Sequence, residues 1–112
     1  MEQNNTISNY FSLIKFSHTV FALPFAIIGY LLALMLTDAA FDAKILVYVL
    51  LCMVFARSAA MAFNRYIDRH IDGDNPRTAI REIPAGIIKP NAAFGFVLVT
   101  SALFVSTTYF IN

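Results

Sequence analysis

The chain has 112 residues, of which 59% are hydrophobic and 13% are charged, and its formal net charge is +1. Soluble domains are about half apolar and about a quarter charged, so this composition points to a membrane protein. The net charge gives no reason to expect nucleic-acid binding, because the basic residues are interleaved with acids. The single cysteine, Cys52, excludes an internal disulfide and a cysteine-based zinc site.

Three apolar segments are each long enough to cross a bilayer, which takes roughly 20 residues. The apolar segments are residues 16–37, 45–63 and 91–112, and the helices that contain them are predicted at about residues 16–37, 45–72 and 90–112. Residues 1–17 resemble an interfacial lead-in with aromatic anchors. Nothing breaks a helix from Ile45 to Gly73, so we expect the second helix to continue past the bilayer core. The sequence therefore predicts an all-α integral membrane helical bundle with a loop at about residues 73–89.

The short connections predict the orientation of the bundle. The connection at residues 38–44 holds one lysine, whereas residues 64–89 hold five of the eight basic residues in the chain. The positive-inside bias places the N-terminus and the charged loop in the cytoplasm.

A polar stripe follows the end of the second span. Asn64, Asp68 and Asp72 are spaced by four, and Arg57 lies almost three turns before Asp68, so all four share one face of a helix. The carboxylates of Asp68 and Asp72 repel each other, and a divalent cation such as Mg²⁺ would compensate. The alternative is an ordinary salt-bridged helix end, in which Arg65 pairs with Asp68 and Arg69 pairs with Asp72.

The next segment favours a phosphate ligand. Asn75 can cap a new helix that begins at Pro76, which would place Arg77 and Arg81 near a helix N-terminus. Arginine forks and free backbone N–H groups both suit phosphate oxygens. Carboxylates that hold a cation, followed by arginines that hold phosphates, together predict a diphosphate site.

The pattern N-x3-D-x3-D, followed by R-T-x-x-R, resembles the first aspartate-rich motif of the UbiA family of intramembrane prenyltransferases. Here it reads Asn64-x3-Asp68-x3-Asp72 and then Arg77-Thr78-Ala79-Ile80-Arg81. The stretches at residues 15–26 and 57–65 also resemble the 4-hydroxybenzoate polyprenyltransferase-like branch. One departure is Arg81-Glu82-Ile83-Pro84, where many members read Arg-Pro directly.

The resemblance implies an intramembrane enzyme that moves a polyprenyl group from its diphosphate to an aromatic acid such as 4-hydroxybenzoate, in quinone biosynthesis. It implies a bacterial plasma-membrane location and a larger multi-helix fold, of which residues 1–112 would be the N-terminal portion. A second aspartate-rich motif is absent from the sequence, so we expect no turnover from this chain alone.

The resemblance also suggests a role for each polar residue in the stripe and the loop. Mg²⁺ would be held by Asn64, Asp68 and Asp72, with the two aspartates essential for catalysis. The substrates would be bound by Arg57, Arg69, Arg77 and Arg81, with Arg57 orienting the carboxylate of the acceptor. Substituting Asp68 or Asp72 by Ala is expected to abolish transfer with little loss of folded protein.

Two alternatives remain open at this point. One is a prenyltransferase with another acceptor, such as a dihydroxynaphthoate or haem. The other is a small transport or assembly module of the membrane, in which Arg57, Asp68 and Asp72 form an ion path or a helix-packing network.

Overall fold

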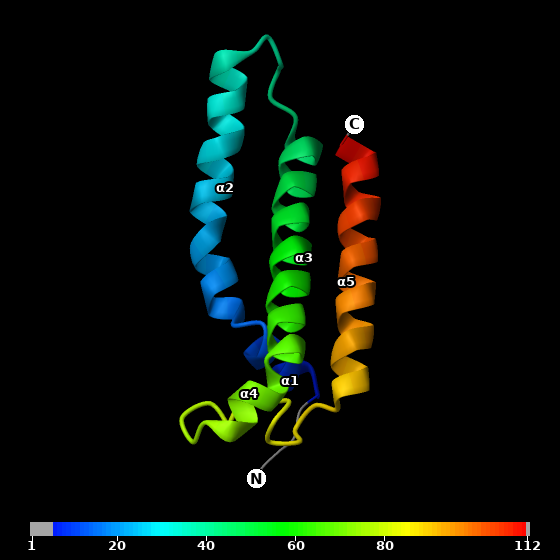
Figure 1. Cartoon of the computed structure of the whole chain (residues 1–112). Helices are drawn as coiled ribbons and strands as arrows, with labels where there is room; N and C mark the ends of the chain where they lie inside the picture. Colours follow the sequence, from blue (N-terminus) through cyan, green and yellow to red (C-terminus); the bar gives the residue numbers. More distant parts are fainter. Residues whose placement is uncertain (1–5, 112) are drawn as a thin grey trace.

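The computed structural model describes residues 6–111, and within that range the chain forms helices and turns without a strand (Figure 1). The helices are α1 (Thr6–Leu13), α2 (Phe16–Leu36), α3 (Ala43–Ile67), α4 (Arg69–Asp74) and α5 (Pro90–Ile111). The predicted all-α fold is confirmed.

Three of these helices, α2, α3 and α5, are long and apolar enough to cross a membrane. The first and third predicted spans agree with α2 and α5 to within one residue at the described ends, while Asn112 lies outside the described residues. Large apolar side chains are exposed along all three helices, as expected where the surroundings are lipid or further protein. The chain is an integral membrane protein.

The closest packing in the bundle is between α3 and α5, which run side by side, whereas α2 packs less extensively on α3 (Figure 1). Ala62 of α3 and Ala93 of α5 are both fully buried. Small residues let helix backbones approach closely, which is the main source of packing where lipid is as apolar as the side chains.

A short connection joins the C-terminal end of α2 to the N-terminal end of α3. The Tyr30 hydroxyl accepts a hydrogen bond from the Asp42 N–H at 2.9 Å and donates one to the Asp42 carbonyl at 3.1 Å. The Asp42 carboxylate in turn accepts from the Lys44 N–H at 2.9 Å and caps the N-terminus of α3.

The second predicted span, 45–72, is wrong as a single helix, because α3 ends at Ile67 and α4 begins at Arg69 (Figure 1). Asp68 between them has φ −86° and ψ 2°, outside the helical well. The i to i−4 backbone bonds continue on both sides, since Asp68 N–H reaches the Asn64 carbonyl at 3.0 Å and Asp72 N–H reaches the Asp68 carbonyl at 2.7 Å. The helix therefore bends at Asp68 without opening into a loop, and it ends at Asp74.

The N-terminal helix α1 is part of the packed core, which the sequence did not predict. Lys15 adopts a left-handed conformation with φ 52°, which separates α1 from α2. Leu13 and Ile14 beside this break are 1% and 3% exposed. The buried apolar cluster that they join contains Ala62, Ile83, Ile88, Ala93 and Val97. We call this end of the bundle, where α1, α4 and residues 75–89 gather, the charged end (Figure 1).

Candidate functional site

The segment after α4 forms turns, and the helix predicted to begin at Pro76 is absent from the described residues. Asn75 forms an Asx-turn in place of the expected helix cap, because its Oδ1 accepts from the Arg77 N–H at 3.0 Å and its carbonyl accepts from the Thr78 N–H at 3.0 Å. The Thr78 hydroxyl then donates to the Asp72 carbonyl at 2.9 Å and ties the turn back to α4. Arg77 and Arg81 are consequently held by turns and not by a helix N-terminus.

Residues 75–89 are fixed to the bundle by apolar anchors and, on the side of α1, by a polar contact. Ile83 and Ile88 are 5% and 4% exposed, in the same buried cluster as Leu13. The Ser12 hydroxyl of α1 donates to the carboxylate of Glu82. Between the two anchors the chain reverses at Gly86, whose φ of 82° suits glycine. The loop that carries the arginines is therefore positioned by α1 as well as by α3 and α5.

The central feature of the charged end is an ion pair between Asp72 and Arg81. The distance from Arg81 Nη1 to Asp72 Oδ2 is 3.0 Å, and their side chains are 37% and 9% exposed. This pair joins the last residue of the N-x3-D-x3-D pattern to the last residue of the R-T-x-x-R pattern. The two motifs, read separately in the sequence, form one structural unit.

The other members of the stripe are less enclosed. Asn64, Asp68 and Arg77 are exposed, whereas Asp72 is buried, so the four-residue spacing does not give one uniformly open face. Among residues 6–111, no three His, Cys, Asp or Glu side chains come together as a metal-binding group.

The chemistry of these donors nevertheless suits one kind of metal site. Mg²⁺ prefers oxygen ligands and is usually held by one or two carboxylates together with substrate phosphates. Asn64, Asp68 and Asp72 supply an amide and two carboxylates. This donor set fits a Mg²⁺ shared with a bound phosphate group.

The interpretation of the charges as an ordinary salt-bridged helix end is not supported in the described part of the chain. Arg69 donates from Nη1 to the Tyr66 carbonyl at 2.7 Å and stacks on the Tyr66 ring, with its guanidinium carbon 4.2 Å from the ring centroid. Asp72, the expected partner of Arg69, pairs with Arg81. Neither of the two predicted i, i+3 pairs is present within residues 6–111.

Arg57 lies deeper in the bundle, on the middle of α3. Its Nε donates a long hydrogen bond of 3.4 Å to Thr19 Oγ1 on α2, and Thr19 is only 1% exposed. Arg57 itself is half-buried. A bond through Nε leaves the two terminal nitrogens of the guanidinium as donors, which is the fork that matches a carboxylate.

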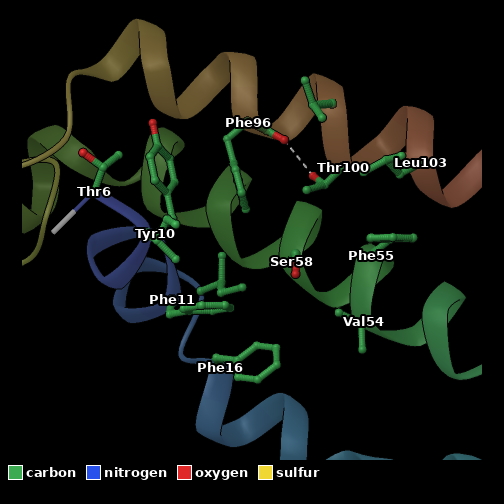
Figure 2. A pocket seen from close by; sticks show the side chains of 13 residues that line it. Thr6, Tyr10, Phe11, Phe16, Val54, Phe55, Ser58, Phe96, Thr100 and Leu103 are labelled. Carbon is green, nitrogen blue, oxygen red and sulfur yellow. Dashed lines mark hydrogen bonds between the residues drawn. The ribbon is translucent and has the colours of Figure 1, made fainter.

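A separate cavity of about 410 Å³ lies between α1, α3 and α5 (Figure 2). Its lining is apolar and rich in aromatic side chains, among which Tyr10 and Phe96 stack with centroids 4.9 Å apart. Thr100 donates to the Phe96 carbonyl at 2.8 Å, and Ser58 also lines the cavity (Figure 2). None of the predicted site residues lines it, so the cavity is not the place where the charged groups meet.

Three residues that position the site were not predicted from the sequence. Ser12 and Glu82 connect α1 to the loop across 70 positions, and Thr19 contacts Arg57 across 38 positions. The adjacent apolar pair Leu13-Ile14 in a polar lead-in is the one signal that could have indicated docking of α1. Nothing in the local sequence distinguishes Thr19 from other small polar residues in apolar helices.

Comparison with known proteins gives a consistent set of relatives. The family described as the UbiA prenyltransferase family matches residues 22–112. A protoheme IX farnesyltransferase of Bdellovibrio bacteriovorus is 40% identical over 84 residues, which cover 75% of this chain and 28% of that protein. A 4-hydroxybenzoate octaprenyltransferase of Vibrio cholerae is 39% identical over 69 residues, covering 59% of this chain and 24% of the relative.

A 4-hydroxybenzoate octaprenyltransferase of Yersinia pseudotuberculosis is 51% identical over 47 residues, covering 42% of this chain and 16% of the relative. The matched part thus spans 28% or less of the length of each of these curated relatives. No solved structure matches the chain.

Proposed function

Because the chain belongs to the UbiA prenyltransferase family, we propose that the whole protein transfers a polyprenyl group from its diphosphate to an aromatic acceptor within the membrane. The observation that carries this proposal is the Asp72–Arg81 pair at 3.0 Å, since it joins the acidic and the basic motif at one end of a membrane-spanning bundle. A diphosphate with its counter-ion needs both kinds of group in one place.

Arg77 and Arg81 are the proposed ligands of the diphosphate. Both are held on a loop whose backbone is fixed by turns and by buried Ile83, so their side chains can reach a ligand without movement of the loop. Charge-assisted hydrogen bonds from arginine stabilise the negative charge that develops as a diphosphate leaves.

Asn64, Asp68 and Asp72 are the proposed holders of Mg²⁺. When bound, the cation would neutralise the charge of the leaving diphosphate. The apolar helices around this end would exclude the water that otherwise captures an allylic cation. Asp68 and Asp72 are therefore proposed to be essential for transfer.

Arg57 is proposed to bind the carboxylate of the acceptor. Its Nε donates to Thr19, so the two terminal nitrogens of the guanidinium remain as donors for a ligand. It lies about two turns deeper in α3 than Asn64. Arg69, which stacks on Tyr66, is proposed to help bind a substrate at the charged end.

Two acceptors are supported by the relatives. An aromatic acid such as 4-hydroxybenzoate, used in quinone biosynthesis, is the acceptor we favour, because Arg57 offers a fork for a carboxylate and two of the relatives described above are named for 4-hydroxybenzoate. Haem is the second candidate, since a protoheme farnesyltransferase is 40% identical over 84 residues. Competition between labelled 4-hydroxybenzoate and haem would separate them.

We further propose that the protein lies in a bacterial inner membrane, with the charged end in the cytoplasm. The bias of basic residues toward residues 64–89 supports this orientation.

The experiment that tests the proposal measures transfer of a polyprenyl group to labelled 4-hydroxybenzoate by membranes that contain the whole protein. We expect transfer by the wild type and a raised acceptor KM in Arg57→Gln, with the donor KM unchanged. Lys44→Gln, which removes a positive charge at the other end of α3, is the control and should leave both KM values unchanged. Absence of transfer to any aromatic acceptor would refute the function, and an unchanged acceptor KM in Arg57→Gln would refute the role of Arg57.

A further inference from the structure

The Asp72–Arg81 pair places two proposed ligand-binding groups against each other. Asp72 is proposed to hold the cation and Arg81 to hold the diphosphate, yet each is at present the partner of the other at 3.0 Å. Neither group can bind its ligand fully without giving up this partner. The following inference rests on the proposed function of the site.

We infer that the site takes its divalent cation and its diphosphate together, by an exchange of partners between Asp72 and Arg81. A diphosphate that takes Arg81 alone leaves a buried carboxylate unpaired, which is costly. A cation that takes Asp72 alone leaves the Arg81 guanidinium unpaired beside another positive charge. When both ligands arrive, Asp72 exchanges Arg81 for the cation and Arg81 exchanges Asp72 for a phosphate, so no charge is left without a partner.

The local structure allows this exchange as a movement of one side chain. Asp72 is held in place, because its N–H reaches the Asp68 carbonyl at 2.7 Å and its carbonyl accepts from Thr78. The Arg81 backbone is held by Ala85, whose N–H reaches the Arg81 carbonyl at 2.9 Å. The Arg81 side chain is 37% exposed, so it can turn toward a ligand while the loop stays docked.

No other basic group in the described residues takes the place of Arg81. Arg69, one turn before Asp72 in the chain, is occupied by the carbonyl and the ring of Tyr66. Arg81 is the basic residue paired with Asp72 in the part of the chain that the structure describes. Once Arg81 moves to a phosphate, Asp72 loses the basic partner that it has in the described residues, and a bound cation would replace the lost positive charge.

The test measures the binding of each component alone to the purified whole protein, so that complexes between the two in solution do not interfere. Titration of Arg81→Gln with Mn²⁺ should give an affinity about tenfold tighter than in the wild type, because Asp72 is then already free. Titration of Asp72→Asn with pyrophosphate in the presence of a chelator should likewise give an affinity about tenfold tighter, because a neutral amide holds Arg81 less tightly than a carboxylate does.

Each control variant removes a nearby charge of the same sign and leaves the Asp72–Arg81 pair intact. Asp74→Asn removes an exposed acid on α4 and Lys89→Gln removes an exposed base on the same loop, neither of which is paired with Asp72 or Arg81. We expect each control to change the corresponding affinity by less than about twofold, since exposed charges interact weakly.

A measurement on the wild type keeps the inference testable if a variant fails to fold. The preformed complex of Mn²⁺ and pyrophosphate should raise the melting midpoint more than the sum of the rises with Mn²⁺ alone and with pyrophosphate alone, because only the joint ligand leaves every charge paired. An equal rise with Mn²⁺ alone would overturn the exchange.

The failure of this inference is distinguishable from the failure of the proposed function. If the wild type transfers prenyl groups but neither variant binds its single ligand more tightly than its control, the pair is only structural and the exchange is overturned. If the wild type transfers nothing and binds neither Mn²⁺ nor pyrophosphate, the proposed function and the exchange fail together.

Discussion

The structure predicts that Asp68→Ala and Asp72→Ala have different effects on stability, although both are proposed to abolish transfer. Asp68 is exposed, and its side chain makes no hydrogen bond or ion pair within residues 6–111. Asp72 is 6% exposed and paired with Arg81. The expectation from the sequence, that both substitutions leave the folded protein almost unchanged, is therefore kept for Asp68 and revised for Asp72.

The size of the difference follows from the geometry of the pair. A hydrogen bond to a charged group contributes about 1.5–3 kcal/mol, and removing one partner leaves the other unsatisfied. The Arg81 side chain is 37% exposed, so water recovers part of its hydration and the loss lies near the lower end. We expect Asp72→Ala to lower the free energy of unfolding by about 1–2 kcal/mol, and Asp68→Ala by less than about 0.5 kcal/mol.

The assay is the melting midpoint of the whole protein in detergent. It is measured for Asp68→Ala, for Asp72→Ala, for Arg81→Gln and for the double variant Asp72→Ala/Arg81→Gln. Residues that form one pair give non-additive effects, so the double variant should melt close to the less stable single variant. Equal midpoints for Asp68→Ala and Asp72→Ala, or fully additive effects of the Asp72 and Arg81 substitutions, would refute the reasoning.

Three further predictions concern the positioning of the charged end. Leu13→Ala should destabilise the whole protein by about 2–5 kcal/mol, since Leu13 is 1% exposed. Ile7→Ala, at a position that is 68% exposed on the same helix, should cost much less, and equal losses in the melting midpoint would show that α1 is not docked as described. Gly86→Ala should lower the melting midpoint, because Gly86 has a φ of 82° that a side chain strains. Gly29→Ala, where nothing lies within 4 Å of the added Cβ, should leave the melting midpoint unchanged. A larger loss in Gly29→Ala than in Gly86→Ala would contradict the turn at Gly86. In Asp74→Cys, a membrane-impermeant thiol reagent should modify the new cysteine in inverted vesicles and not in intact cells, and labelling of intact cells would reverse the proposed orientation.

The sequence was sufficient to predict the all-α membrane fold, the first and third spans, and the family. Apolar length alone gave α2 and α5 almost to the residue, because a bilayer imposes both a minimum length and internal hydrogen bonding on any spanning segment. The motif at Asn64, Asp68 and Asp72, combined with Arg77-Thr78-Ala79-Ile80-Arg81, pointed to the family, since a specific chemistry fixes residue types at fixed spacing.

The limits of the sequence are visible at Asp68 and Asn75. Helical propensity and the absence of a breaker suggested one helix from Ile45 to Gly73, but the chain bends at Asp68. A cap followed by proline suggested a helix after Asn75, but the Thr78 hydroxyl and the buried anchor Ile83 hold turns there instead. The turns after Asn75 show that such contacts outweigh local preferences of about a kilocalorie per mole or less.

Which charge pairs with which was decided by the tertiary structure alone. Local spacing proposed Arg69 as the partner of Asp72, but the folded chain brings Arg81 to it from nine residues away and turns Arg69 onto Tyr66. The sequence by itself determined that oxygen ligands and arginines are present at one end of a membrane bundle. The partner of each was set by the docking of α1 and of residues 75–89, because a pair forms only where buried apolar contacts hold two side chains within reach.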